Sequence, residues 1–144
     1  MSQSNIRPAT PDDFSDILDM MKNALDELGE EYKEAVLVNK IVVSYYHAPC
    51  FLLVINGIIC GMAGLTVKTS SMSGNATLMD YMFYIKPEYR SLKNLSGLVE
   101  KSKEFALQNQ LPLRLEFVSG SEKVRKRLFE MHGFEIKAVV GQYG

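Results

Sequence analysis

The predicted structure changes from strand to turn at residues 84–90, which read Tyr-Ile-Lys-Pro-Glu-Tyr-Arg. They close the long strand expected over residues 76–85, and Pro87, which has no backbone N–H, forces the chain out of the sheet. Apolar side chains then recur at helical spacing over residues 95–106, and a strand is expected over residues 113–118. A strand–helix–strand unit of this kind implies a right-handed crossover and two neighbouring parallel strands.

Two helices are expected before the first hairpin. Residues 6–9 predict a short edge strand, because Pro8 cannot donate to a central ladder. Thr10-Pro11 then opens a helix that has acids in its first turn and ends at Gly29. A second helix is expected over residues 32–46. The side chains predicted to face inward from it are Val38, Ile41, Val42 and Tyr45.

The clearest hairpin signal is Asn56-Gly57, which lies between two apolar runs at residues 50–55 and 58–68. A two-residue turn places Leu53 opposite Cys60, so Cys50 points to the other face of the sheet. We therefore expect both cysteines to be reduced, small core side chains of a cytoplasmic protein rather than a disulfide.

The remaining elements complete a β, α, α, β, β, β, α, β, α, β order. Residues 69–75 predict a hairpin loop, a last helix opens at residues 119–122 and ends at His132-Gly133, and a final strand is expected over residues 134–140. This order predicts an α+β fold with a mixed, mostly antiparallel sheet, one parallel strand pair and about four flanking helices.

Length and composition narrow the functional classes. The 144 residues predict a single domain spanning residues 1–144. Sixteen basic and seventeen acidic residues, a net charge of −1, argue against a surface built for nucleic acid or an anionic membrane. No apolar run approaches the roughly 18 residues that span a bilayer, and none near the N-terminus is typical of a signal peptide. Two cysteines, and two histidines without partners at ligand spacing, indicate no metal site.

Three stretches together resemble the GNAT superfamily of N-acetyltransferases. Residues 6–13 resemble the family's opening strand and helix, residues 84–90 with the following helix resemble its acyl-CoA motif, and residues 128–134 resemble its closing motif. The resemblance implies a sheet whose parallel pair splays apart. It also implies acetyl-CoA as acyl donor and direct transfer to an amine of a small molecule or protein. The loop after Pro87 is similar to that of phage-encoded members.

The resemblance also implies a cofactor site. Phe83, Tyr84 and Ile85 would hold the pantetheine arm, through backbone groups of Phe83 and Ile85 in the manner of an added strand. The turn and helix start after them would hold the pyrophosphate. The residues of this turn are Arg90, Ser91, Leu92, Lys93, Asn94, Leu95 and Ser96. Lys93 and Leu95 stand where the family has glycines. The phosphate cradle is therefore either altered, with Asn94 as a left-handed residue and Lys93 adding charge, or lost.

Asp80, on the strand that enters the site, is the candidate base that helps to deprotonate the amine. The family's general acid is a tyrosine in the closing helix, and Phe129 takes its place here. A coenzyme A thiolate could leave without strong acid help, or Tyr84 or Tyr81 could substitute as the acid. The alternative is a GNAT-fold protein that has lost transfer activity and works by binding, as a virion or interaction component. The sequence does not indicate which amine is the acceptor.

Two further expectations concern partners. The helix over residues 32–46 lies on the acceptor side in this fold, where Glu31, Glu34 and Asn39 could meet a cationic substrate, although a solvated face is the simpler interpretation. Residues 135–144 are too few for the family's final pair of strands. The last strand is therefore either missing or supplied by a second copy, which makes a homodimer one prediction.

Overall fold

The computed structural model describes residues 3–116 and 122–136. Their strands form one sheet in the order β1–β2–β3–β4–β5, antiparallel throughout except for the parallel β4–β5 pair. This confirms the α+β class and the mixed, mostly antiparallel sheet. The strands are β1 (Ser4–Pro8), β2 (Cys50–Ile55), β3 (Ile58–Thr69), β4 (Ala76–Ile85) and β5 (Leu113–Arg114).

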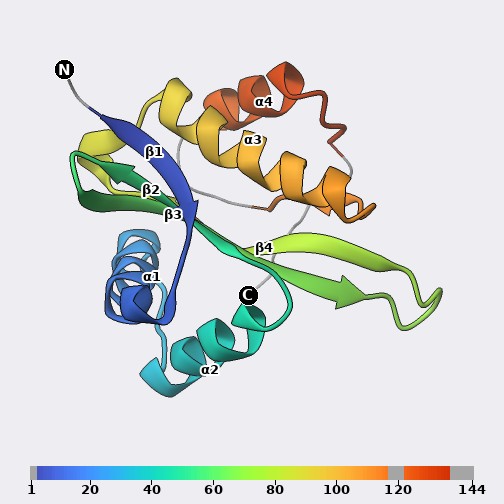
Figure 1. Ribbon diagram of the computed structural model, residues 1–144, viewed down its shortest axis with the longest axis horizontal. Helices are drawn as coiled ribbons and strands as arrows, with labels where there is room; N and C mark the ends of the chain where they lie inside the picture. Colours follow the sequence, from blue (N-terminus) through green and yellow to red (C-terminus); the bar gives the residue numbers. More distant parts are fainter. Residues whose placement is uncertain (1–2, 117–121, 137–144) are drawn as a thin grey trace.

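In the described part of the chain, four helices flank the sheet, as predicted. Helices α1 (Phe14–Leu28) and α2 (Glu34–Tyr45) cover one face, and α3 (Leu92–Gln108) and α4 (Glu122–Met131) cover the other (Figure 1). Two short 3-10 turns, η1 (Pro11–Asp13) and η2 (Pro87–Tyr89), lead into α1 and toward α3. Among the helices of residues 3–116 and 122–136, none combines the length and the apolar character needed to cross a membrane.

The sheet divides the hydrophobic core into two clusters that share no residue. On the α3–α4 side, Leu98, Val99 and Leu128 pack on side chains of β2, β3 and β4. On the α1–α2 side, Ile17, Met20, Met21, Leu37 and Ile41 pack on Cys50, Leu52, Met62 and Tyr84. Alternate residues of each central strand therefore face opposite clusters, as the period of a β-strand requires.

The buried face of α2 differs from the predicted one. Leu37, Ile41 and Ser44 are buried, whereas Val42 and Tyr45 are 45% and 49% exposed. Apolar side chains surround this helix instead of forming one stripe, so periodicity alone does not define its inner face. The partly or fully exposed valines are Val36, Val38, Val42 and Val43.

The β2–β3 hairpin turns at Asn56 and Gly57, which both adopt positive φ (51° and 77°) as the predicted two-residue turn requires. The register then shifts between Leu53 and Val54, so Leu53 pairs with Gly61 and the predicted pairing with Cys60 is wrong. Cys60 lies at this bulge with its Sγ 3.5 Å from the Leu53 carbonyl oxygen. The cysteines still lie in opposite clusters and are both free, as predicted.

Toward the C-terminal end of the described residues, the strands differ from the predicted ones. The strand expected over residues 113–118 pairs only at Leu113 and Arg114, and residues 117–118 lie outside the described residues. Residues 134–136 form no strand, and the rest of the final strand predicted over 134–140 also lies outside them. Helix α4 ends as predicted, with Gly133 at a φ of 76°.

An ion pair fixes the entry into α1. The Arg7 guanidinium donates to both carboxylate oxygens of Asp13 (2.8 and 2.9 Å), and the Thr10 amide donates to Asp13 Oδ2 (2.8 Å). Asp13 is buried, and the hydrogen bonds from Arg7, outweighing the burial, lower its pKa to about 2. The contact therefore joins β1 to the start of α1 only while Asp13 is ionised.

Asp13→Asn is expected to change how stability depends on pH. A carboxyl whose folded-state pKa is depressed stabilises the fold above its unfolded pKa, and this contribution is lost as the pH falls from about 4 to about 2. Urea unfolding should show the wild type losing about 2 kcal/mol more than Asp13→Asn over this range. Asp12→Asn, at the exposed neighbouring position, is the control, and an equal loss in all three proteins would contradict the assignment.

Candidate functional site

Strand β4 carries a bulge in the middle of the sheet. Leu65 pairs with Asp80 and Gly64 pairs with Met82, so Tyr81 is the extra residue. The Tyr81 ring occupies the space over Gly64, where a Cβ atom would lie 2.5 Å from Tyr81 Cζ. The Tyr81 hydroxyl is hydrogen-bonded to Cys50. Because residue 64 is a glycine, the Tyr81 ring has room to turn toward the α1–α2 side at the bulge. The bulge also changes the direction in which β4 continues.

Within the described residues, the pairing of β4 with β5 is confined to a short stretch beside the bulge. The ladder between them consists of Leu78 with Leu113 and Met79 with Arg114, while β4 runs on to Ile85. At the next position the Glu116 amide donates to the side chain of Asp80 (N···Oδ1 2.8 Å). Burial raises the Asp80 pKa to about 6, and this effect exceeds the lowering by that hydrogen bond. The predicted base therefore lies one residue beyond the described β4–β5 pairs, and its pKa is raised to about 6.

Arg90 holds the end of β4 to α1. Its Nε donates to the carbonyl oxygen of Ile85 (2.8 Å), and its two Nη atoms donate to the two carboxylate oxygens of Glu27 (Nη2···Oε2 2.7 Å). The guanidinium also lies over the Tyr84 ring, 5.4 Å from its centroid. Glu27 balances its charge, so in this structure Arg90 fixes the turn and occupies the Ile85 carbonyl that was predicted to face pantetheine.

The side chains of the predicted pantetheine segment point to opposite cores. Phe83 and Ile85 lie in the α3–α4 cluster, whereas Tyr84 is only 4% exposed and lies in the α1–α2 cluster. The Tyr84 hydroxyl is hydrogen-bonded to Glu27, and burial together with the Glu27 charge raises its pKa. These contacts make Tyr84 a weaker proton donor than a solvated tyrosine.

Helix α3 begins with a side-chain cap. Ser91 Oγ accepts from the Asn94 amide (3.1 Å), and Asn94 Nδ2 donates to the Tyr89 carbonyl oxygen (2.6 Å). The amides of Leu92 and Lys93, at the very start of the helix, have no acceptor within it and point out of its end. The helix dipole adds positive potential at this point, so the turn suits an anion.

The glycines absent from this turn are not required by its geometry. Among the described non-glycine residues only Asn56 and Gln110 have positive φ, so Lys93 and Leu95 are in ordinary helical conformation. Asn94 is likewise helical, and the left-handed conformation considered for it is wrong, because its side chain serves the capping contact instead. The regular helix begins directly after Ser91, so the amides of Leu92 and Lys93 stay without a helical acceptor although the glycines are absent.

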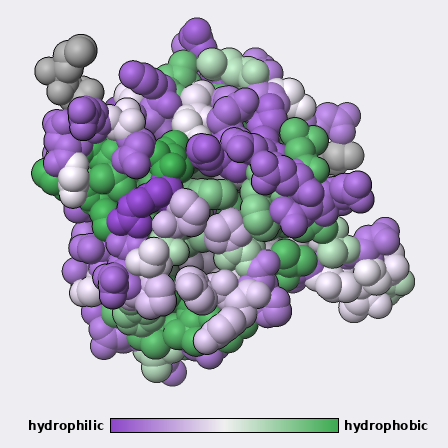
Figure 2. Space-filling model, in the orientation of Figure 1, coloured by the Kyte–Doolittle hydropathy of each residue, from purple (hydrophilic) through white to green (hydrophobic). Residues whose placement is uncertain are grey.

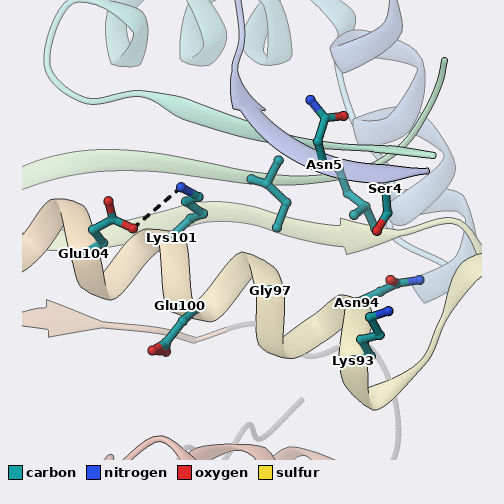
Figure 3. A pocket seen from close by; sticks show the side chains of 10 residues that line it. Ser4, Asn5, Lys93, Asn94, Gly97, Glu100, Lys101 and Glu104 are labelled. Atoms are coloured by element: carbon teal, nitrogen blue, oxygen red, sulfur yellow. Dashed lines mark ion pairs between the residues drawn. The ribbon is translucent and has the colours of Figure 1, made fainter. Parts of the chain in front are cut away.

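The predicted phosphate residues separate into two groups. Leu92 and Leu95 pack on the α3–α4 cluster, and the Ser96 hydroxyl lies 2.8 Å from His132 Nε2. Lys93 and Asn94 line a groove of about 390 Å³ between β1 and α3, in which Lys101 and Glu104 form an ion pair farther along the helix (Figure 3). Of the residues predicted to form the phosphate cradle, Ser91, Lys93 and Asn94 are thus the ones that lie at the open helix end without packing on the core.

A contact between α3 and α4 escaped sequence analysis. His132 Nδ1 lies 3.1 Å from Glu100 Oε2, and Lys103 Nζ donates to the His132 carbonyl oxygen (3.0 Å). With Ser96 this has the outline of a serine–histidine–carboxylate relay. Ser96 lies within the regular part of α3, however, where its own amide is used by the helix, so we interpret the group as a clamp between helices. The only feature of the sequence that pointed to this contact is the four-residue spacing of Ser96 and Glu100, which puts both side chains on one face of the helix.

Phe129 stands at the position of the family's tyrosine acid, and its ring packs in the core. The Phe129 ring lies 5.4 Å from the Phe134 ring, centroid to centroid, and packs on the α3–α4 cluster. It offers no proton. In the described part of the chain, no three histidine, cysteine or acidic side chains come together in a way that could hold a metal ion.

A second, more apolar pocket lies on the opposite side of the sheet. It measures about 260 Å³ and is formed by the start of α1, by α2 and by Cys50 and Tyr81 of the sheet. Apolar side chains also gather on the outer surface over α2 (Figure 2). None of the three residues that could meet a cation is among the residues that line the pocket: Glu34 forms an ion pair with Lys22, and Glu31 and Asn39 are exposed, as the simpler interpretation of a solvated face predicts.

Comparison with solved structures identifies the architecture. A protein described as a predicted acetyltransferase from Clostridium acetobutylicum, solved with acetyl-CoA, superimposes with a TM-score of 0.77 at 15% identity, over 99% of this chain and 96% of that one. The aminoglycoside acetyltransferase AAC(6')-Iy, solved with a CoA-bearing bisubstrate analogue, gives 0.74 at 13% identity, over 99% and 97%. The chain has the GNAT fold.

A GNAT family acetyltransferase from Staphylococcus aureus, at 20% identity and a TM-score of 0.65, covers 100% of this chain and 98% of its own. No family model and no curated protein matches the sequence. The GNAT fold is thus recognised here through the arrangement of its elements, in agreement with the three short motifs.

Asp80→Asn is expected to stabilise the protein above pH 6. Folding raises the Asp80 pKa from 3.8 to about 6, so ionising this carboxyl costs folding free energy at neutral pH, and the cost disappears as the pH falls through about 6 toward 4. Asparagine keeps an oxygen acceptor for the Glu116 amide. Urea unfolding at pH 7.5 should show a gain of up to about 3 kcal/mol that vanishes near pH 4. The control is Asp26→Asn, at an exposed position of α1, and a gain unchanged at low pH would contradict this account.

Proposed function

We propose that this protein is an acetyl-CoA-dependent N-acetyltransferase that transfers the acetyl group directly to an amine. The observation that carries the proposal is the start of α3, which follows β4 after one short turn: Ser91 caps the helix there, and the amides of Leu92 and Lys93 have no acceptor within it. Strand β4 thus carries the half-buried carboxylate of Asp80 and leads, through a short turn, to a helix end that suits an anion. Two proteins of the same fold were solved with acetyl-CoA or a CoA analogue, which supports this cofactor.

The residues present fit the phosphate end of the cofactor. The amides of Leu92 and Lys93 and the Lys93 ammonium would hold the pyrophosphate, while Arg90 is already balanced by Glu27. The backbone of β4 before Ile85 would take the pantetheine arm, since the Ile85 carbonyl is used by Arg90. When bound, acetyl-CoA supplies an acetyl group already activated as a thioester.

Asp80 would accept the proton that the amine loses. An amine attacks only in its neutral form, and a protein amine with a pKa of about 10.4 is almost fully protonated at neutral pH. A carboxylate whose pKa is about 6 is ionised at pH 7 and yet basic enough to take up a proton in the transition state. No strong acid is required on the other side, because a thiol with a pKa of about 8.5 leaves readily as a thiolate.

A second function, binding without transfer, is favoured by three differences from the family's pattern. Lys93 and Leu95 replace the family's glycines, and Phe129 lacks the hydroxyl of its acid. A protein of this kind would use the same fold to bind a partner. Cofactor binding and turnover separate the two functions.

Lys93→Glu is expected to weaken acetyl-CoA binding at least about tenfold, because it replaces a phosphate-attracting charge with a repelling one at the open helix end. Isothermal titration calorimetry measures the dissociation constant directly. Lys101→Glu is the matched control, since Lys101 lies eight residues, or about 12 Å, farther along the same helix.

Absence of binding at millimolar acetyl-CoA would overturn the proposed enzyme and favour the binding protein. Equal weakening by Lys93→Glu and Lys101→Glu would instead contradict the placement of the phosphates at the start of α3.

Asp80→Asn is expected to lower kcat by about 10²–10³ with a panel of primary amines, because it removes the group that accepts the proton. Release of free thiol from acetyl-CoA measures turnover. The wild-type rate should rise with pH through an apparent pKa near 6, and this limb should be missing in the variant. A variant that keeps the wild-type pH profile would exclude Asp80 as the base.

A further inference from the structure

The outer edge of the sheet, at β1, borders a groove. Strand β1 is the first strand of the sheet, and no described residue pairs with its free side. Helix α3 runs beside this strand, and the groove of about 390 Å³ lies between the two (Figure 3). We propose that the groove binds an extended peptide segment that adds to β1 as a further strand and carries one acidic side chain.

The first step of the argument concerns the backbone of β1. The carbonyl oxygen of Gln3 and the amide of Ala9 are both bonded to residues of the β2 side (2.8 and 2.7 Å). Bonded and non-bonded residues alternate along an antiparallel pair, so Ser4 and Ile6, between these two, direct their backbone groups away from β2. Two N–H and two C=O groups therefore face the open side, where no described residue takes them up.

This part of the edge has none of the usual protection against pairing with another chain. Such protection comes from proline, charge or a bulge. Pro8 lacks an N–H and its carbonyl oxygen accepts from Arg7 Nη1 (3.2 Å), but residues 4–6 carry no charge, proline or bulge in their pairing with β2. Extended peptides add to open edges of this kind: main-chain hydrogen bonds hold them, and pockets select alternate side chains.

The second step is the shape of the groove. Its floor is apolar where Ile6, Leu53 and Gly97 meet, and a Cβ atom at Gly97 would lie 2.9 Å from Ile6 Cδ1. A larger residue there would push α3 away from β1. The charged wall extends from Lys93 to Glu104, eleven residues and therefore about 16 Å along the helix axis. Five extended residues, at about 3.3 Å each, span this length.

The third step is charge. Lys101 and Glu104 lie 3.6 Å apart at one end of the groove and balance each other. Glu100 is engaged on its other side, where His132 Nδ1 lies 3.1 Å from its carboxylate. Lys93, at the end near Ser4, has no carboxylate partner in the part of the chain that the structure describes. A peptide carboxylate at this end would meet an unbalanced positive charge, whereas a peptide lysine would be repelled.

A lone extended chain fits this place better than a second copy of the protein. Helix α3 lies directly against β1 at Gly97 and Ile6, so a second copy paired through the same edge would bring its own α3 beside this one. Paired strands lie about 4.8 Å apart, whereas packed helices need about 8–10 Å between their axes. The two helices would be crowded, and a peptide brings no helix.

The test uses two probe peptides, acetyl-Thr-Glu-Thr-Val-Thr-amide and acetyl-Thr-Val-Thr-Glu-Thr-amide, because an open edge accepts a strand in either direction. In both, Glu and Val lie on one face, about 6.6 Å apart, and Lys93 and Gly97 are about 6 Å apart along α3. The peptides are titrated by calorimetry into the full chain. No cofactor is added, because Lys93 is also proposed to meet the pyrophosphate.

One of the two peptides should bind with a dissociation constant below about 1 mM. Replacing its Glu with Lys should weaken binding at least about threefold at low salt. Methylating single backbone nitrogens of the peptide should weaken binding at least about tenfold at alternate residues and little at those between, because only every second N–H faces β1. Absence of binding by both peptides at 1 mM, equal binding of the Glu and Lys forms, or methylation effects without alternation would each overturn the proposal.

Two variants at one position test the edge from the side of the protein. Ser4→Pro removes an outward N–H and no bond to β2, whereas Ser4→Ala removes only the hydroxyl. Peptide affinity should fall at least about tenfold in Ser4→Pro and change less than about twofold in Ser4→Ala. Equal losses in the two variants would contradict strand addition. Urea unfolding shows whether Ser4→Pro is folded, and if it is not, the methylation series on the wild type decides.

The inference stands apart from the proposed acetyl transfer, since every titration is made without acetyl-CoA. Peptide binding without any binding of acetyl-CoA would leave the groove assigned and the transferase refuted, and the converse result would refute the groove alone. Sedimentation adds one more outcome. A wild-type dimer that Ser4→Pro dissociates and Ser4→Ala does not, without peptide binding, would assign the β1 edge to a second copy and overturn the proposal.

Discussion

One guanidinium group sets the geometry on which the site depends. Arg90 donates to the carbonyl oxygen of the last β4 residue, to both oxygens of Glu27 on α1, and lies over the Tyr84 ring. Pro87 has just taken the chain out of the sheet, and these contacts act together with the bond from Asn94 Nδ2 to the Tyr89 carbonyl oxygen to hold the turn that follows. Arg90 therefore fixes where α3 starts relative to the sheet and which way its open end points. A bidentate arginine–carboxylate pair is suited to this because its two parallel hydrogen bonds define a direction as well as a distance.

Local signals in the sequence were sufficient for most of the fold. Asn56-Gly57 gave the turn, Pro87 gave the exit from the sheet, and Gly29 and Gly133 gave two helix ends with positive φ. Each of these features depends on the conformational preference of one or two residues, which sequence displays directly. The order of elements then left few topologies, because a strand–helix–strand connection is right-handed.

What sequence did not show depends on contacts between distant residues. Glu27 is 63 positions from Arg90 and Ser96 is 36 from His132, and neither pairing has a local signature. The two bulges shift strands by one residue for reasons of packing, Tyr81 over Gly64 being one, so pairing counted from the turn was wrong beyond Val54. The buried face of α2 was predicted wrongly because valines lie on several sides of this helix. In each case tertiary packing, and not local preference, decides the outcome.

The division of the core by the sheet has a consequence for how such a protein can change. Substitutions at residues that share no neighbours generally add in their effects on stability, whereas those in contact do not. The α1–α2 cluster and the α3–α4 cluster have no residue in common. Substitutions in the α1–α2 cluster away from Tyr84, which contacts Arg90, are therefore expected to add to those beneath the start of α3 in their effect on stability. Glu27 is the exception on α1, because it holds Arg90 and through it the turn before α3.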